Sequence, residues 1–311
     1  MSGREFKTFS DILSFVKSCE RQKVAIACAA DEAVLKAADI AFSEGILDSM
    51  LFGAASKIKK VADSLKIDIE KFTIIDIASD KEAAEAAVTS VKNGDAHILM
   101  KGHMPTSLFL KSVLNRENGL RRAKILSHVQ VFECPITGRI RMLSDGGMNL
   151  APKEEELNCI AHNAITAFYE ICGRSPNVAM ISAYNQPDGR LAASVFMPQI
   201  AAELLSGTAY GTIDISGPMT LDVAVSKSAA SKKNFTGRGA GNADVFILPN
   251  IETGNLFGKC LTYFAKAPSA GLIIGAARPI IMLSRADDHS TKLNSMSIGC
   301  IMALKERNLI K

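Results

Sequence analysis

Short apolar runs alternate with helix-like segments along most of the chain, and this alternation restricts the possible folds more than any other feature. In the first third, apolar runs of strand length occupy 24–29, 49–53, 72–77 and 96–100. Segments with helical character separate them, such as the alanine- and glutamate-rich stretch 80–92. A repeated strand–helix order places parallel strands in one sheet with helices on its faces. The sequence therefore predicts an α/β protein.

The second half returns to the same order after one interruption. The runs 125–132 and 139–143 flank a turn-rich connector and predict an antiparallel hairpin. Further strands are expected at 177–183, 210–215, 244–248 and 271–276, and helices at 153–171, 191–205, 220–233 and 252–266. Pro198 should kink or interrupt the second of these helices. This half therefore predicts a second α/β unit.

The length of 311 residues allows two domains of ordinary size. The segment 144–152 contains two adjacent glycines and one carboxylate, which is typical of a hinge or of a loop that lines a cleft. We place the domain boundary near this segment. The first domain is then expected to comprise 1–143 plus 286–311, and the second 144–285.

Composition excludes several classes of protein. The net charge is only +4, and the basic residues form no stripe, so we expect no nucleic-acid partner. The seven cysteines are odd in number and include no C-x-x-C pair, which favours reduced thiols in the cytoplasm and no zinc site. The five histidines show no metal-ligand spacing. We find neither a signal-type apolar region nor a run of transmembrane length, and expect no membrane partner.

The first candidate site lies near the C-terminus, where the apolar run 280–283 changes abruptly to polar residues. A buried parallel strand would deliver these residues at its carboxyl end, where ligands bind in open α/β sheets. Arg285 carries a rigid fork of donors suited to phosphate, and Ser284 can donate to phosphate or to an oxyanion. Asp287 and Asp288 could accept a proton. Alternatively, one of them is a helix N-cap paired with the arginine.

The second candidate site follows the run 96–100. Lys101 and Gly102 at a strand end would allow the backbone to approach an anion, and Pro105 suits the first turn of a helix beginning near Thr106. The alternative is an ordinary connection with an exposed lysine.

Four further residues could line a cleft. Asp145 and Asn149 lie in the predicted hinge loop, and Glu252 and Asn255 lie at the start of a predicted helix after a strand. Each also has a structural interpretation, as a cap or a hinge contact.

Several motifs have a characteristic order along the chain. They are Lys101-Gly102 with Thr106; Leu126-Ser127-His128-Val129; Ser144-Asp145-Gly146-Gly147-Met148-Asn149 with Pro152; Gly217-Pro218 with Leu221-Asp222; Ala243-Asp244-Val245 with Pro249, Glu252, Gly254 and Asn255; and Ser284-Arg285-Ala286-Asp287 with Lys292-Leu293. In their order and spacing the chain resembles the phosphate acetyltransferase and phosphate butyryltransferase family over nearly its whole length. The chain length and the Ser-Arg-Ala-Asp form of the last motif are more similar to the butyryl branch.

This resemblance implies both a fold and a reaction. The implied fold has two α/β domains with an active-site cleft between them, the architecture shared with isocitrate and isopropylmalate dehydrogenases. The implied reaction reversibly converts acyl-CoA and phosphate into acyl phosphate and CoA, with butyryl-CoA favoured. Coenzyme A is then a substrate, no cofactor is expected, and a homodimer or higher homo-oligomer is expected.

The resemblance also implies residue roles. In the acetyl branch an arginine is thought to hold phosphate and an aspartate to accept the thiol proton. Ser284 and Arg285 match that motif, but Thr291 stands where the aspartate would align, so Asp287 is the expected base and Asp288 the reserve. The expected catalytic set is Ser284, Arg285 and Asp287. The expected substrate-binding residues are Lys101, Thr106, Asp145, Asn149, Glu252, Asn255 and Asp288.

Three other functions remain open from the sequence. The first is acetyl transfer, because a single methylene changes substrate discrimination by only ~1–3 kcal/mol. The second is a non-catalytic sensor of acyl-CoA or acyl phosphate. The third is a metal- and nicotinamide-dependent dehydrogenase on the shared architecture, which should show clustered aspartates that the sequence lacks.

Overall fold

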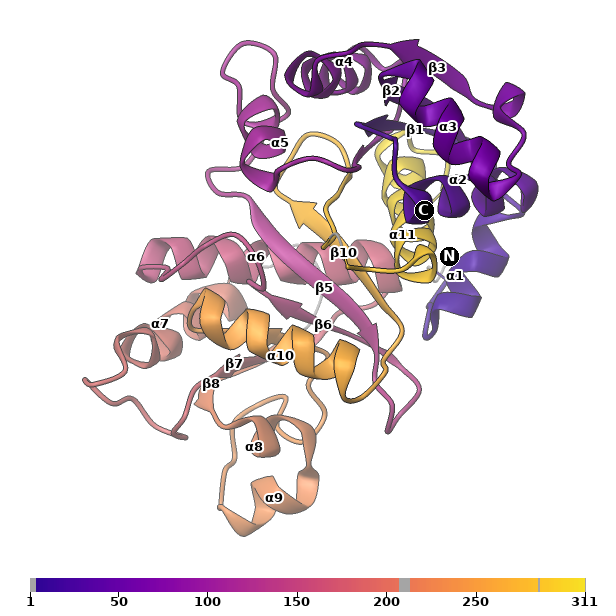
Figure 1. Cartoon of the computed structure of the whole chain (residues 1–311). Helices are drawn as coiled ribbons and strands as arrows, with labels where there is room; N and C mark the ends of the chain where they lie inside the picture. The colour runs from indigo at the N-terminus through magenta and orange to yellow at the C-terminus, as the bar shows by residue number, and fades with distance from the viewer. Residues whose placement is uncertain (1–3, 207–212, 285, 311) are drawn as a thin grey trace. The chain divides into compact units, whose positions relative to one another are not determined.

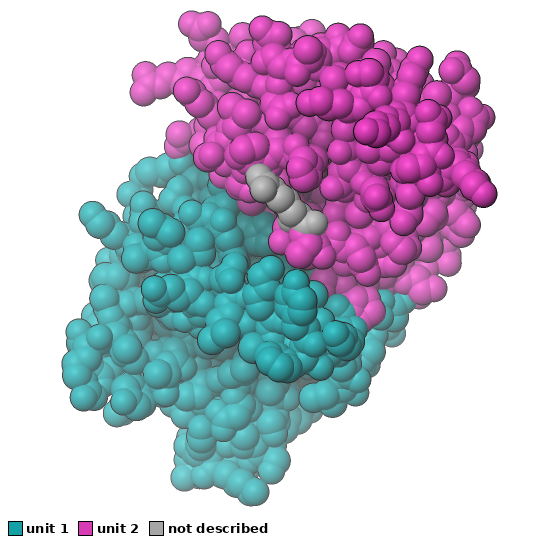
Figure 2. Space-filling model, in the orientation of Figure 1, with its two compact units in different colours: residues 1–8, 124–267 teal, residues 9–123, 268–311 magenta. Residues whose placement is uncertain are grey.

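The computed structural model describes residues 4–206, 213–284 and 286–310. The chain forms two compact units (Figure 2): unit 1 comprises 1–8 with 124–267, and unit 2 comprises 9–123 with 268–311. The sequence placed its domain boundaries later in the chain, at 143/144 and 285/286. The difference arises from strand pairing, as the following description of each unit shows.

Unit 2 contains a six-stranded sheet in the order β3-β2-β1-β4-β11-β10. The strands are β3 (Thr73–Asp76), β2 (Leu47–Gly53), β1 (Gln22–Ala27), β4 (Ile98–Lys101), β11 (Ile280–Ile281) and β10 (Ser269–Ile274). All neighbours are parallel except β10 and β11. The predicted strand 280–283 is therefore parallel to β4, as expected, but only its first two residues join the ladder. The pairing of β10 with β11 assigns 268–285 to this unit.

Helices precede, connect and follow these strands (Figure 1). They are α1 (Phe9–Val16), α2 (Glu32–Ser43), α3 (Ala55–Leu65), the 3₁₀ turn η1 (Ile69–Lys71), α4 (Asp80–Asn93), α5 (Thr106–Val113) and α11 (His289–Glu306). Side-chain caps fix two helix starts: Asp31 accepts from the Val34 N–H before α2, and Ser79 accepts from the Glu82 N–H before α4. Helix α11 packs on α2 and β10 and buries most of its length.

Unit 1 contains a five-stranded sheet in the order β5-β6-β9-β7-β8. The strands are β5 (Ser127–Glu133), β6 (Ile140–Ser144), β9 (Val245–Ile247), β7 (Asn177–Ile181) and β8 (Asp214–Met219). The predicted antiparallel hairpin is confirmed as β5 and β6. Because β6 also pairs in parallel with β9, the hairpin belongs to this unit and moves the boundary to 123/124.

The helices of unit 1 differ from the predictions in one place. They are α6 (Glu154–Cys172), α7 (Ala192–Ser206), α8 (Leu221–Val225), α9 (Lys227–Lys232) and α10 (Ile251–Tyr263). Pro198 lies inside α7 without interrupting it. The single helix expected at 220–233 is two helices, because Ser226 adopts an extended conformation and caps α9 through the Ala229 N–H. Half of the strand predicted at 210–215 lies outside the described residues; β8 begins at Asp214.

The predicted α/β class is confirmed in both units. No helix of the described segments has the length and apolar character needed to cross a membrane.

Candidate functional site

The chain leaves β11 in a tight turn that carries Ser284 and Asp287, two of the predicted catalytic residues. The Ser284 N–H donates to Asp287 Oδ2 at 2.8 Å, and the Asp287 N–H donates to the Ser284 carbonyl at 3.2 Å. These two bonds hold Ser284 and Asp287 together at the carboxyl end of the strand. Arg285, the third residue of the predicted catalytic set, lies outside the described residues.

Helix α11 begins directly after this turn. Asp288 is its N-cap, and Asp288 Oδ1 accepts from the Thr291 N–H at 2.8 Å. Partial burial opposes ionisation of this carboxyl, but the hydrogen bonds from Thr291 together with the positive charges of His289 and Lys292 hold the pKa of Asp288 below its ordinary value. The capping role, which the sequence allowed for either aspartate, is thus confirmed for Asp288.

The end of β4 supplies the second candidate site. Lys101 is only 5% exposed, and its Nζ donates to the carbonyls of Gly102 at 3.2 Å and Met104 at 3.1 Å. The alternative interpretation of Lys101 as an exposed lysine is therefore wrong. The next residue must be glycine, because a Cβ on Gly102 would lie 2.3 Å from the Cys28 carbonyl oxygen. Thr106, at the start of α5, is exposed.

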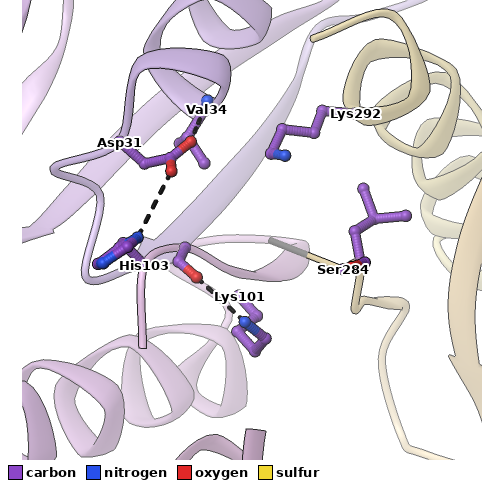
Figure 3. Close-up of a pocket in the computed structure, with 8 residues that line it drawn as sticks. Asp31, Val34, Lys101, His103, Ser284 and Lys292 are labelled. Carbon is purple, nitrogen blue, oxygen red and sulfur yellow. Dashed lines mark hydrogen bonds and ion pairs between the residues drawn. The ribbon is translucent and has the colours of Figure 1, made fainter. Parts of the chain in front are cut away.

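The carboxyl ends of β4 and β11 meet at a narrow pocket in unit 2 (Figure 3). We call it the lysine pocket; it is lined by Asp31, Val34, Lys101, Gly102, His103, Leu283, Ser284 and Lys292. Of the predicted site residues, Lys101 and Ser284 meet here. Thr106, Asp287 and Asp288 do not line it, although Asp287 and Asp288 lie next to it along the chain.

Sequence reasoning assigned no substrate-binding role to three polar residues of the lysine pocket. Lys292, on α11, is 4% exposed, and its Nζ donates to the Asp287 carbonyl at 2.6 Å. Asp31 caps α2, and its Oδ2 lies 3.6 Å from His103 Nδ1. Lys292 belongs to the last motif and His103 follows Lys101-Gly102, so both were close to the signals that the sequence offered. Their convergence depends on the sheet order, which one sequence does not reveal.

In unit 1, Asp145 organises the loop that follows β6. Its carboxylate is 2% exposed and accepts from the backbone N–H groups of His128 at 3.2 Å, Gly147 at 2.7 Å and Met148 at 2.9 Å. It also accepts from Asn149 Nδ2 at 2.5 Å, and the same amide donates to the Leu126 carbonyl. The structure thus brings the predicted pair Asp145 and Asn149 together and engages both in holding the loop.

Helix α10 presents the remaining two candidates. Asn250 caps this helix by accepting from the Thr253 N–H at 2.9 Å. Glu252 and Asn255, in the first turns, are exposed. Gly254 lies on the buried side, where an added Cβ would come within 2.1 Å of the Asp145 carbonyl oxygen. The start of α10 therefore packs directly on the Asp145 loop and leaves Glu252 and Asn255 accessible.

The described residues contain no group of three or more histidine, cysteine, aspartate or glutamate side chains that could hold a metal ion. The chemistry that these side chains offer is cationic binding of an anion in the lysine pocket, with hydroxyl and carboxylate groups in the adjoining turn.

Comparison with solved structures supports the architecture. The chain superimposes on a branched-chain phosphotransacylase from Enterococcus faecalis V583 with a TM-score of 0.77, at 29% identity, covering 91% of this chain and 99% of that one. A 4-hydroxythreonine-4-phosphate dehydrogenase from Burkholderia phymatum shares the fold at a TM-score of 0.55 and 10% identity, covering 91% and 98% of the two chains. The predicted dehydrogenase-like architecture is confirmed.

Sequence comparison supplies the family. The model described as "Phosphate acetyl/butaryl transferase" matches residues 8–89 and 81–300. A phosphate butyryltransferase from Clostridium acetobutylicum is 38% identical over 297 residues, which is 96% of this chain and 98% of that protein. These matches, which extend over nearly the whole length of the sequence, show that the chain belongs to the phosphate acetyl/butaryl transferase family.

Proposed function

We propose that the protein interconverts an acyl-CoA and inorganic phosphate with an acyl phosphate and CoA, and that butyryl-CoA is the favoured acyl donor. Family membership supports the reaction, and the 38% identity to a phosphate butyryltransferase supports the acyl preference. The observation that carries the proposal is the lysine pocket, where buried lysines and Ser284 meet at the carboxyl ends of β4 and β11. Positive charge at this edge of the sheet suits the binding of a phosphate group.

In the direction of acyl-CoA formation, the CoA thiol loses its proton to Asp287, and the thiolate sulfur forms a bond to the carbonyl carbon of the acyl phosphate. The bond from that carbon to the phosphate oxygen then breaks, and phosphate leaves with the electron pair. Ser284 stabilises the oxyanion of the tetrahedral intermediate, and Arg285 and Lys101 hold the phosphate. Phosphate is a good leaving group, so no covalent enzyme intermediate is needed.

Transfer of the thiol proton to the base is the step that depends most on the surroundings of the two groups. A thiol has an ordinary pKa near ~8.5 and an aspartic acid near ~3.9, so an ordinary aspartate is a weak base for CoA. Desolvation of the carboxylate and positive charge beside the thiol narrow this difference. Asp287 is a better assignment than Asp288, because the Asp288 carboxylate is engaged as the N-cap of α11 and accepts from the Thr291 N–H. General base assistance contributes about 10²–10⁴-fold.

The remaining candidates have supporting roles in this proposal. Glu252 and Asn255 are exposed at the start of α10, and Thr106 is exposed at the start of α5, so all three are available to contact substrate. Asp145 and Asn149 act on the substrate indirectly, through the loop that they hold.

We also propose that the enzyme acts in the cytoplasm as a homodimer or larger homo-oligomer, without a cofactor and with CoA as a substrate. All seven cysteines are free thiols, as is usual in a reducing compartment. Size-exclusion chromatography with light scattering measures the number of subunits directly.

The test of function is phosphate-dependent release of CoA from butyryl-CoA and from acetyl-CoA, with the free thiol measured colorimetrically. The variants are Arg285→Ala and, as a matched control, Arg116→Ala, which removes an exposed arginine of unit 2. We expect faster release from butyryl-CoA, a large loss in Arg285→Ala and none in Arg116→Ala.

Each other outcome has a defined meaning. Faster release from acetyl-CoA would replace the butyryl assignment with the acetyl one. Full activity in Arg285→Ala would remove Arg285 from the site. No phosphate-dependent release from either substrate would reject the transferase and favour a sensor of acyl-CoA or acyl phosphate.

A further inference from the structure

Two buried lysines from different elements line the same small pocket (Figure 3). Lys101 comes from the end of β4 and is 5% exposed, and Lys292 comes from the second turn of α11 and is 4% exposed. Lysine is almost never this deeply buried unless an opposite charge or a ligand compensates for its lost hydration. Placing two ammonium groups in one pocket adds their mutual repulsion to that cost.

The contacts of Lys292 compensate only part of this cost. Its Nζ donates to the Asp287 carbonyl at 2.6 Å. Its positive charge also contributes to the lowered pKa of the nearby Asp288 carboxyl, but among the described residues Lys292 forms no direct ion pair with a carboxylate. An ammonium group has three donors, so a single carbonyl leaves capacity for another acceptor. The carboxylate that lines the pocket, Asp31, caps α2 through the Val34 N–H and faces His103.

We propose that Lys292 is a phosphate-binding residue: its ammonium group, together with that of Lys101, binds the phosphate of inorganic phosphate or acyl phosphate beside Ser284. A phosphate dianion supplies both a negative charge and a further acceptor for the ammonium group of Lys292. This inference rests on the proposed function, which makes phosphate a substrate.

The hydrogen bond from Lys292 to the Asp287 carbonyl is a structural contact. An experiment must separate its loss from a loss of ligand binding. This bond ties α11 to the turn that holds Ser284 and Asp287. Lys292→Met removes both the charge and the hydrogen bond, whereas Lys292→Gln removes the charge and keeps a donor for that carbonyl. Lys36→Met is the matched control, because Lys36 is an exposed lysine on α2, the helix that Asp31 caps.

Two measurements are made on the full-length protein. The first is the rise in melting temperature produced by inorganic phosphate, which reports phosphate binding without requiring activity. The second is the KM for phosphate beside the KM for butyryl-CoA in the CoA-release assay. We expect both Lys292 variants to lose most of the phosphate-induced rise and to raise the phosphate KM by about 10- to 100-fold, the effect of losing a charged hydrogen bond. The butyryl-CoA KM and the Lys36→Met variant should change little.

Two results would overturn the inference. One is an unchanged phosphate KM and an unchanged phosphate-induced stabilisation in both Lys292 variants. The other is a loss of kcat in Lys292→Met that Lys292→Gln restores at an unchanged phosphate KM, which would make Lys292 a positioning residue only. Failure of the proposed function looks different, because wild type itself would then release no CoA, while the melting temperatures would still decide whether Lys292 binds phosphate.

Discussion

Two pockets of unit 2 lie at opposite ends of the same three elements, β4, β11 and α11. The lysine pocket is at the carboxyl ends of the two strands and the start of α11. The other, which we call the arginine pocket, is at the amino ends of the strands and the end of α11; it is lined by Gly94, His97, Arg278, Ala303, Glu306 and Arg307. Both pockets are rich in positively charged side chains, but the partners of these side chains differ between the two ends.

In the arginine pocket the cations are paired within the protein. Arg278 Nη1 lies 3.3 Å from Glu306 Oε2. Arg307 Nη2 lies 3.2 Å from Glu20 Oε1, and Arg307 Nη1 donates to Gln22 Oε1 at 3.0 Å. In the lysine pocket the Nζ bond of Lys292 is to a main-chain carbonyl. A cation that is paired with a carboxylate has its charge neutralised within the protein. A cation that is bonded to a neutral carbonyl keeps its charge and still attracts an anion. The difference therefore supports the proposal that the lysine pocket binds the phosphate of the substrate.

The largest expected difference is in the free energy of unfolding, between alanine variants of the two glycines that line these pockets. Gly102→Ala should lower the free energy of unfolding by about 3 kcal/mol, because the new Cβ would collide with the Cys28 and Ala27 carbonyl oxygens at 2.3 and 2.6 Å. Gly94→Ala meets nothing within 4 Å and should cost only about 1 kcal/mol, for a residue at φ +85°. Urea unfolding of both variants measures the two values. Equal costs would contradict the close approach of β4 to β1.

The next effect concerns the charge of the lysine pocket. Lys101→Met should raise the phosphate KM by about 10- to 100-fold, equivalent to about 1.4–2.7 kcal/mol, because it removes one of the two ammonium groups from the phosphate site. Steady-state kinetics with varied phosphate measures this, with Lys36→Met as the control. An unchanged phosphate KM in Lys101→Met would remove Lys101 from the binding site.

A substitution in the arginine pocket should lower stability and leave phosphate binding unchanged. Arg307→Met should lower the free energy of unfolding by about 1 kcal/mol or less, because the side chain is 32% exposed and its ion pair with Glu20 is screened by water. The phosphate KM should not change. A double-mutant cycle with Glu20→Gln isolates the pair. A raised phosphate KM in Arg307→Met would mean that the two pockets are coupled.

The smallest effect is a pH dependence that arises in the arginine pocket. Burial, followed by the positive charge of Arg307, lowers the pKa of His97 below its ordinary value of 6.5, so the folded protein disfavours the protonated ring. The unfolded chain then binds the proton more readily, and stability that is present above about pH 6.5 is lost as the pH falls below it. Thermal unfolding at about pH 7.5 and about pH 5.5 should show a smaller loss in His97→Asn than in wild type. Asparagine retains an acceptor for the Lys23 N–H, which donates to His97 Nδ1 at 3.2 Å.

The sequence predicted most of the strands and helices because each depends on local periodicity. Strand β11 was expected to be longer, since its apolar run continues to Leu283, but only Ile280 and Ile281 find partners on both sides. The single helix expected at 220–233 divides because the extended conformation of Ser226 depends on its tertiary surroundings. Local pattern therefore identifies an element better than it identifies its ends.

The candidate site was predicted in part. Ser284 and Lys101 were identified because each follows an apolar run, and strand ends of a parallel sheet meet at one edge. Lys292 received no substrate-binding role, because a lysine within a helix resembles a solvated residue until the packing of α11 buries it. The structural role of Asp145 was given as an alternative, a cap or a hinge contact, but its donors could not be named because they come from β5 and from its own loop.

The contact between Gly254 and the Asp145 carbonyl has a practical consequence for protein engineering. With no room for a Cβ at Gly254, the start of α10 and the Asp145 loop form one fixed platform. Glu252, Asn255 and Leu256 project from that platform into solvent, with Leu256 67% exposed. A library that varies this surface should therefore keep Gly254 and Asp145 constant and randomise these three positions, where new side chains leave the scaffold intact.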